Sequence, residues 1–184
     1  MEIQVIRKRE GNWSRSLCLA HLRRYLCEAL GFSSWEKARN SKTFGEMKQS
    51  FVTRLENSDP KMCLLASLEV IRRIFELDAK TMRRSKSLGL SDEEHLRELA
   101  RVRNKHSRTL MQDLDKMVMQ YLQPTYAKRN GKQADGSAEG QVWVNAQGKN
   151  ATGAFVVYYL NNRADFWTFL EDPNIPLSTN EVER

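Results

Sequence analysis

The feature that most constrains the fold is a long apolar stripe between Ser91 and Pro124. Its members recur at steps of three and four residues and are Leu96, Leu99, Val102, His106, Leu110, Leu114, Met117 and Tyr121. Steps of this kind place side chains on one face of an α-helix. Ser91-Asp92-Glu93-Glu94 has the spacing of a capping box and predicts where the helix begins. A helix this long needs a partner for its apolar face, so we expect a mainly α fold.

A second helix is predicted directly before this one. Ser58-Asp59-Pro60 places a capping side chain beside a proline at the first helical position, and Ser87-Leu88-Gly89 ends the segment. Its apolar face consists of Leu64, Leu65, Leu68, Ile71, Ile74 and Phe75. An antiparallel hairpin over about 60–122 is the simpler interpretation. A coiled coil that dimerises through 96–121 is the alternative, although its three to four heptads are few.

Weaker patterns predict the remaining elements. These are a short strand at Ile3 to Val5, a helix from Ser14 or Ser16 to about Leu30, a looser helical stretch over 35–55, a brief strand at 141–144, a helix over 154–170 and a last helix capped by Ser178 or Thr179. We therefore expect a basic helical region over 1–126 and a flexible Gly-, Lys- and Asn-rich connection over 127–153. A C-terminal helical segment over 154–184 completes the chain.

The charge of the chain indicates a polyanionic partner. Its 30 Lys and Arg against 23 Asp and Glu give a net charge of +7, with +5 in residues 1–58 and −3 in residues 154–184. Such a balance favours nucleic acid. The longest apolar run, Ala154 to Leu160, is far shorter than the roughly 20 residues of a membrane-spanning helix. Three cysteines without tight spacing argue against a disulfide framework. We expect a cytoplasmic protein with no membrane partner.

Two segments of the chain resemble one family. The first is Cys18-Leu19-Ala20-His21-Leu22-Arg23-Arg24-Tyr25, and the second runs from Tyr158-Tyr159-Leu160-Asn161-Asn162 through an aromatic stretch to Ile175-Pro176-Leu177-Ser178-Thr179-Asn180-Glu181-Val182-Glu183-Arg184. In this order they resemble the insertion-sequence transposases of the family numbered sixty-six, whose segments read C-W-A-H-x-R-R and, at the close, x-I-P-x-x-N-N-x-x-E-R. Leu19 replaces the family's Trp, and Thr179 replaces the first Asn. The resemblance covers about residues 15–184 and is weak between 35 and 90.

The resemblance implies a ribonuclease-H-like catalytic core with a helical insertion before its last carboxylate. This chain would hold the insertion and the C-terminal helix, with most of the core sheet missing. An Asp-Asp-Glu triad in the family holds two Mg²⁺ or Mn²⁺ ions for strand cleavage and transfer. By motif position Glu183 is the catalytic, metal-binding carboxylate. The candidate DNA contacts are His21, Arg23, Arg24, Asn180 and Arg184.

The aspartates of this triad precede the Cys-x-x-His segment in the family, whereas the first aspartate here is Asp59. We therefore expect a truncated or remnant transposase that holds no metal stably and is inactive alone. Its expected partners are DNA at the element ends and either full-length transposase or a second copy. The alternative is a non-catalytic, basic helical protein that binds DNA or assists transposase assembly.

Each candidate residue also has a simpler explanation. Glu183 suits the first turn of any helix, because acidic side chains there interact favourably with the positive end of the helix dipole. A solvated helix face explains Arg23 and Arg24 equally well. Cys18 and His21 have the spacing of half a zinc site, but the sequence offers no compact second pair of ligands. A core cysteine and a surface histidine are therefore the simpler interpretation of that pair.

Overall fold

The computed structural model describes residues 5–9, 12–16, 18–42, 44–46, 60–122, 127–131, 140–144 and 150–178. This part of the chain is mainly helical, as predicted. Its elements are β1 (Val5–Arg9), β2 (Asn12–Ser16), α1 (Leu19–Ala29), α2 (Trp35–Arg39), α4 (Pro60–Ser87), α5 (Asp92–Val102), η1 (Arg103–Ser107), α6 (Arg108–Met117), η2 (Val118–Leu122), β3 (Ala127–Gly131), β4 (Gly140–Val144), α7 (Ala151–Asn161) and η4 (Ala164–Leu170). The strands form two separate antiparallel pairs, β1–β2 and β3–β4.

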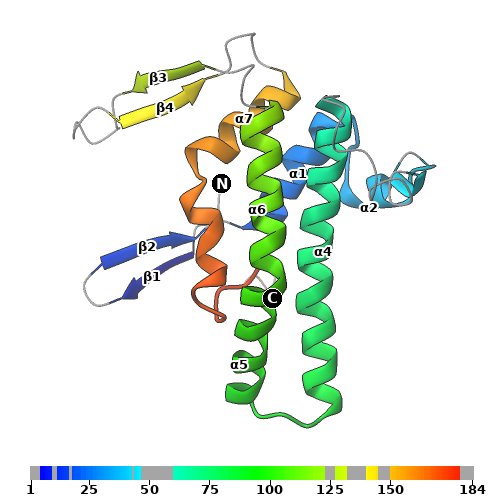
Figure 1. The fold of residues 1–184 in the computed structure, drawn as a ribbon, viewed down its shortest axis with the longest axis vertical. Helices are drawn as coiled ribbons and strands as arrows, with labels where there is room; N and C mark the ends of the chain where they lie inside the picture. Colours follow the sequence, from blue (N-terminus) through cyan, green and yellow to red (C-terminus); the bar gives the residue numbers. More distant parts are fainter. Residues whose placement is uncertain are drawn as a thin grey trace.

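A long helical hairpin is the largest feature of the fold (Figure 1). Helix α4 begins at Pro60 as predicted, and α5, η1, α6 and η2 form one continuous rod that packs back along it. Gly89 has a φ of +63° in the turn, a conformation that glycine adopts readily. Ser91 and Glu94 form the predicted capping box. The hairpin buries Leu99, Leu114 and Met117 of the predicted apolar stripe, as the antiparallel interpretation expects.

The buried face of the second hairpin rod differs from the predicted stripe. Its buried positions are Leu99, Arg103, Ser107, Met111, Leu114, Met117, Val118 and Leu122, whereas Val102 and Leu110 are half-buried and His106 is exposed. The cause is η1, a π-helical turn, which holds an additional residue compared with an α-helical turn. Around this turn Arg103 and Ser107 are buried in place of Val102 and His106, whereas Leu99 before the turn and Leu114 and Met117 after it are buried as predicted.

The N-terminal helix begins later than predicted. Ser14 and Ser16 lie in β2, where they pair with Arg7 and Val5, so neither of them caps a helix. Helix α1 starts at Leu19 instead. Of the strand predicted at Ile3 to Val5, only Val5 lies in the described residues, where it begins β1 (Val5–Arg9). The pairing of β1 with β2 was not predicted, because neither strand has a clear alternating pattern.

Two further predictions need correction. Of the helix expected over 35–55, the structure shows α2 and helical residues 42 and 44–46, and 47–59 lie outside the described residues. The helix expected over 154–170 is divided, because α7 ends at Asn161 and the 3-10 helix η4 begins at Ala164. Helix α7 starts at Ala151, where the Asn150 side chain accepts a hydrogen bond from the Gly153 amide at 2.6 Å.

The glycine-rich stretch contains the predicted strand, β4, and also β3, which was not predicted. Ser178 is not helical, and Thr179 to Arg184 lie outside the described residues. The predicted last helix therefore remains a prediction, as do the boundaries of the three regions.

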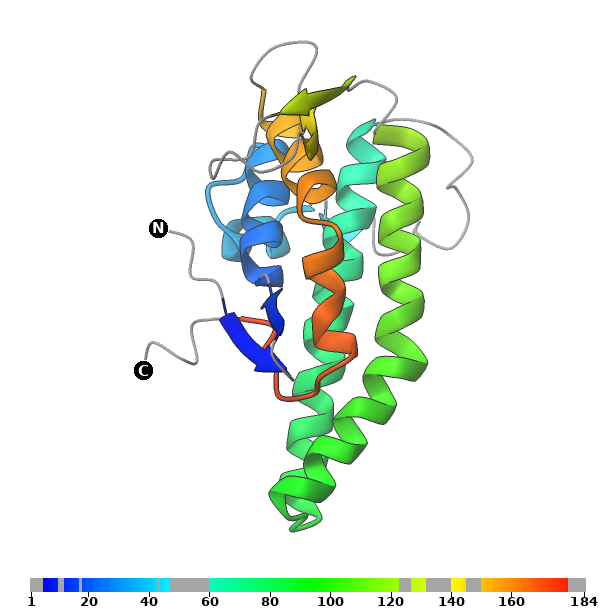
Figure 2. The ribbon, with the colours of Figure 1, turned by 90° about the vertical axis from the view of Figure 1, so that its left-hand side faces the viewer.

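The core lies where α1 and α7 pack against each other and α1 packs against α4. Figure 2 shows α7 and η4 running beside the hairpin. The largest fully buried side chains include Leu22, Leu26, Leu68, Ile71, Phe155, Tyr159 and Phe166. Burial of this much apolar surface is the dominant favourable term in folding. Among the described residues, no helix is long and apolar enough to cross a membrane.

Candidate nucleic-acid interface

The fold brings together the two sequence segments that resemble the transposase family. Cys18, at the start of α1, donates a hydrogen bond from its thiol to the carbonyl oxygen of Leu177, 159 residues away, at 3.5 Å. On the next part of α1, the ring of Tyr25 stacks on that of Tyr158, with centroids 4.5 Å apart. The Cys-x-x-His segment and the approach to the closing motif are therefore neighbours in space.

A buried arginine holds the approach to the closing motif against the hairpin. Arg103 is only 2% exposed, and its Nη2 lies 2.6 Å from Oδ2 of Asp78 on α4. Its Nη1 donates to the carbonyl oxygens of Phe169 and Ile175, both at 3.0 Å, and of Pro173 at 3.4 Å. One guanidinium therefore joins both rods of the hairpin to residues 169–175. The last described residues, up to Ser178, follow directly from this clamp.

Arg23 lies between aromatic rings rather than in open solvent. Its Cζ is 5.2 Å from the centroid of Trp35 and 4.5 Å from that of Phe75, both cation–π distances. Burial lowers the pKa of the Arg23 guanidinium. The side chain thus joins α1, α2 and α4, a structural role that the sequence did not predict. A contact between Arg23 and DNA remains a prediction.

His21 and Arg24 lie on the more accessible side of α1. Arg24 is exposed and forms a loose ion pair with Glu28, with Nε 3.7 Å from Oε1. Exposed pairs of this kind contribute little, so the guanidinium can exchange Glu28 for a phosphate. His21 and Arg24 both line a groove of about 330 Å³ between α1 and residues 32–35. Of the three predicted contacts on α1, Arg24 is the exposed one, whereas His21 and Arg23 are half-buried and Arg23 also lines this groove.

The comparison with protein families covers nearly the whole chain. The family described as "Transposase IS66 family" matches residues 4–184. The chain belongs to this family. No curated protein and no solved structure gives a significant match. The match confirms the resemblance predicted from the two segments and extends it through residues 35–90, where the sequence pattern was weak.

The remaining predicted site residues of this IS66-family chain, Asn180, Glu183 and Arg184, lie outside the described residues. The described segment before them borders a cavity of about 380 Å³ between the hairpin and residues 173–178, with Asp78, His95 and Arg103 in its lining. In the described ranges, no three His, Cys, Asp or Glu side chains are close enough to hold one metal ion. These residues by themselves do not fit a two-metal centre.

Cys27 of α1, which lines the same groove, is expected to be unreactive. Burial raises the pKa of the Cys27 thiol to about 11, because the charged thiolate is disfavoured away from water. A thiol with this pKa is protonated at neutral pH and is a poor nucleophile and metal ligand. Cys27 therefore gives the groove beside His21 and Arg24 of the IS66-family chain no reactive thiol.

Proposed function

We propose that this chain is the part of a DNA transposase that frames the last catalytic carboxylate of a ribonuclease-H-like core. The hairpin would be the helical insertion of that core, and Glu183 would be the carboxylate. The IS66 family match over residues 4–184 carries this proposal. The contact between Cys18 and Leu177 supports it, because it joins the two family segments at the place from which the chain continues toward Glu183.

The residues of this chain would perform two tasks in DNA cleavage and transfer. His21 and Arg24 would contact the phosphodiester backbone, which fixes the register of DNA without reading its sequence. The Arg103 clamp would hold residues 169–175 in place, so that Glu183 starts from a fixed position. A site held by buried hydrogen bonds is more precisely placed than one on a free segment.

We further propose that the 184-residue polypeptide does not cleave DNA by itself. Divalent metals supply the chemistry of such transposases, and they need several carboxylate ligands. The two family aspartates precede the Cys-x-x-His segment, but no aspartate precedes Asp59 here. Of the three carboxylate positions of the family motif, this chain would then provide Glu183 alone, so Mg²⁺ or Mn²⁺ would bind weakly. A full-length transposase is the partner that would supply the two aspartates and complete the centre.

Weak Mn²⁺ binding at Glu183 tests this proposal. Paramagnetic Mn²⁺ should broaden the amide NMR signals of residues around Glu183, and Glu183→Gln should abolish that broadening. Glu181→Gln is the matched control and should retain it. Equal broadening in wild type and Glu183→Gln would contradict the role of Glu183. Mn²⁺-dependent cleavage of a duplex by the wild-type chain, lost in Glu183→Gln, would contradict the proposed inactivity.

A second candidate function is a non-catalytic protein that binds DNA or assembles with a transposase. Lys80 and Lys105 on the hairpin, which are exposed and have no side-chain partner among the described residues, favour it. The two functions differ in their dependence on Glu183. If salt-sensitive DNA binding is strong while Mn²⁺ leaves the Glu183 region unchanged, the non-catalytic function is the better description.

A further inference from the structure

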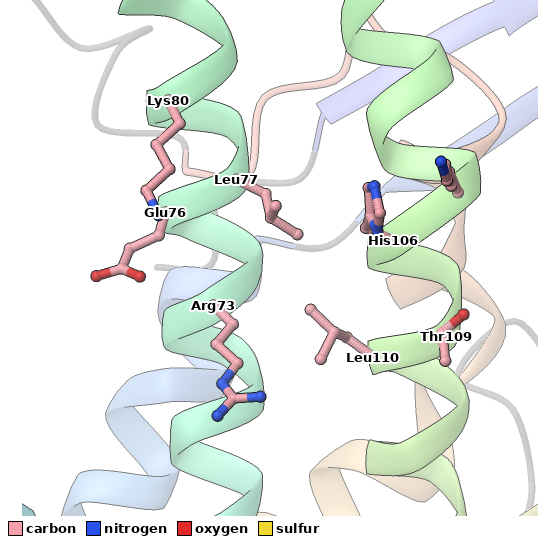
Figure 3. A pocket seen from close by; sticks show the side chains of 8 residues that line it. Arg73, Glu76, Leu77, Lys80, His106, Thr109 and Leu110 are labelled. Atoms are coloured by element: carbon pink, nitrogen blue, oxygen red, sulfur yellow. The ribbon is translucent and has the colours of Figure 1, made fainter. Parts of the chain in front are cut away.

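A second basic groove lies on the hairpin itself, away from the residues predicted from sequence. It has a volume of about 390 Å³ and lies between α4 and the rod formed by η1 and α6 (Figure 3). Arg73 and Lys80 line it from α4, and Lys105 and His106 line it from the other rod. Leu77 and Leu110, both half-buried, form the apolar part of its lining. Basic side chains thus come from both rods onto one groove.

Most of these basic side chains have no partner within the chain as described. Lys80, Lys105 and His106 are exposed, and among the described residues their side chains form no hydrogen bond or ion pair. Arg73 forms an ion pair with Glu69, in which Nε of Arg73 lies 3.0 Å from Oε1 of Glu69. The acidic residue in the lining is Glu76, which is ion-paired with Arg72. The groove therefore keeps an excess of positive charge.

The basic surface continues along α4 toward the tip of the hairpin. Between 79 and 87 the chain has four basic residues and no acidic one: Lys80, Arg83, Arg84 and Lys86. All four are exposed, and none has an ion pair with the described part of the chain. Arg84 and Lys86 also suit the last turn of α4 by opposing its dipole. Lys80 lies well before that turn, so the dipole does not account for it.

The length of this surface favours an extended polyanion over a single phosphate. Arg73 and Lys80 are seven residues apart, which is about 10 Å along a helix axis. Phosphates of one DNA strand advance by about 3.4 Å along the duplex, so about three of them span this distance. A chain of phosphates can therefore contact the groove along its whole length.

We propose that this groove binds the phosphodiester backbone of DNA, as a contact separate from His21 and Arg24. The inference rests on the proposed transposase function: because a transposase acts on DNA, DNA is the polyanion that we expect the groove to bind. Lys80 and Lys105 provide exposed ammonium groups that have no partner to release among the described residues. Neutralising phosphates displaces counterions, so each contact contributes about 0.9 to the slope of log K against log salt.

A salt titration of duplex binding tests the groove. Fluorescence anisotropy with a labelled duplex of random sequence would be recorded between about 50 and 200 mM salt, the range over which such contacts weaken strongly. The double variant Lys80→Gln/Lys105→Gln should lower the slope by about 1.8 and weaken binding roughly tenfold or more at low salt. Lys37→Gln/Lys42→Gln, which removes the same charge from exposed positions around α2, should retain the wild-type slope.

The outcomes separate the groove from the proposed function. A slope that falls in the groove variant but not in the control supports the groove. Equal slopes in both double variants, with wild-type binding intact, overturn the groove and leave the proposed function standing. Absence of salt-sensitive binding by the wild type overturns both. If polyglutamate of matched charge displaces the duplex as well as unlabelled duplex does, the groove is a general acidic-protein surface and the assignment to DNA is overturned. Circular dichroism melts check that all variants are folded.

Discussion

The two sides of the helical hairpin differ in the burial of their positively charged side chains. On one side, Asp78 and Arg103 form a buried ion pair whose guanidinium also binds carbonyl oxygens of the C-terminal segment. Two residues further along each rod, Lys80 and Lys105 line an open groove. Residues two apart in a helix project in roughly opposite directions, so the same pair of rods has one structural and one accessible basic side.

This difference shows why the net charge of +7 does not locate a binding surface. Arg103 contributes to that sum as much as Lys105, yet its charge is neutralised and enclosed by protein. A free ammonium group can release counterions on binding DNA, and a buried guanidinium with its acceptors already in place cannot. The partner of each cation, and not the count of cations, determines where DNA would bind.

The largest expected effect comes from removing the buried cation. Arg103→Met leaves the Asp78 carboxylate and the carbonyl oxygens of Phe169 and Ile175 without their donor. Breaking a buried ion pair in this way costs about 3–5 kcal/mol, which lowers Tm by roughly 10 °C in a chain of this size. The free energy of unfolding from urea denaturation measures the loss. Lys105→Met on the same turn is the control and should change stability by less than about 0.5 kcal/mol.

Equal losses of stability in these two variants would show that the two sides of the hairpin do not differ in the way described. Hydrogen exchange sharpens the comparison. Residues 169–175 should lose protection in Arg103→Met and keep it in Lys105→Met, because only the former removes their side-chain donor.

A smaller effect is expected at Glu69, whose carboxylate forms an ion pair with Arg73 of the groove. Burial alone would raise the pKa of Glu69, but hydrogen bonds from Arg72 and Arg73 outweigh it, so the pKa lies below its usual value. The charged form therefore stabilises the fold above the usual glutamate pKa, and that stabilisation is lost as the pH falls through the lowered value. Glu69→Gln should cost about 2 kcal/mol at pH 7 and flatten the decline in stability below about pH 4.5.

The same substitution tests the groove. Glu69→Gln removes one negative charge beside Arg73, so the salt slope of Glu69→Gln should equal or exceed that of the wild type. A slope clearly below the wild-type value would argue that Arg73 reaches the groove only when Glu69 holds it.

The smallest of these stability effects is expected where α7 meets α6. The Tyr159 hydroxyl donates to Oδ1 of Asp115 at 3.1 Å, and Arg163 binds the same carboxylate with Nη2 2.6 Å from Oδ2. Because Arg163 still pairs with Asp115, Tyr159→Phe should cost about 1 kcal/mol, measured by urea denaturation. A loss as large as that of Arg103→Met would mean that the C-terminal segment is anchored mainly through α7 rather than through Arg103.

The parts of the fold that follow from local chemistry were predicted from the sequence. Pro60, the Ser91–Glu94 capping box and the β4 strand depend on neighbouring residues, so short patterns identify them. The family segments at 18–25 and 158–184 were also sufficient to indicate the transposase family. These local patterns did not predict that Arg103 is buried. Its burial depends on how the π-helical turn η1 packs against α4 and η4, which are distant in the sequence.

The candidate site was predictable only in part. Arg24 is exposed on α1, as a DNA contact requires, but the half-buried Arg23 of the same segment contacts the rings of Trp35 and Phe75, which local patterns do not predict. Lys80 and Lys105 carry no motif, and only the pairing of the two rods places them on one groove. The one local signal for that groove is the run from 79 to 87, which has basic residues and no acidic ones.

The salt dependence of duplex binding by two single variants of one turn tests the account most directly. Arg103→Met and Lys105→Met each remove one positive charge, and both would be measured at a temperature where each is folded. We expect Lys105→Met to lower the slope of log K against log salt by about 0.9 and Arg103→Met to leave it unchanged. Equal slopes for the two variants, or a loss confined to Arg103→Met, would contradict the division of the hairpin into a structural side and a DNA-binding side.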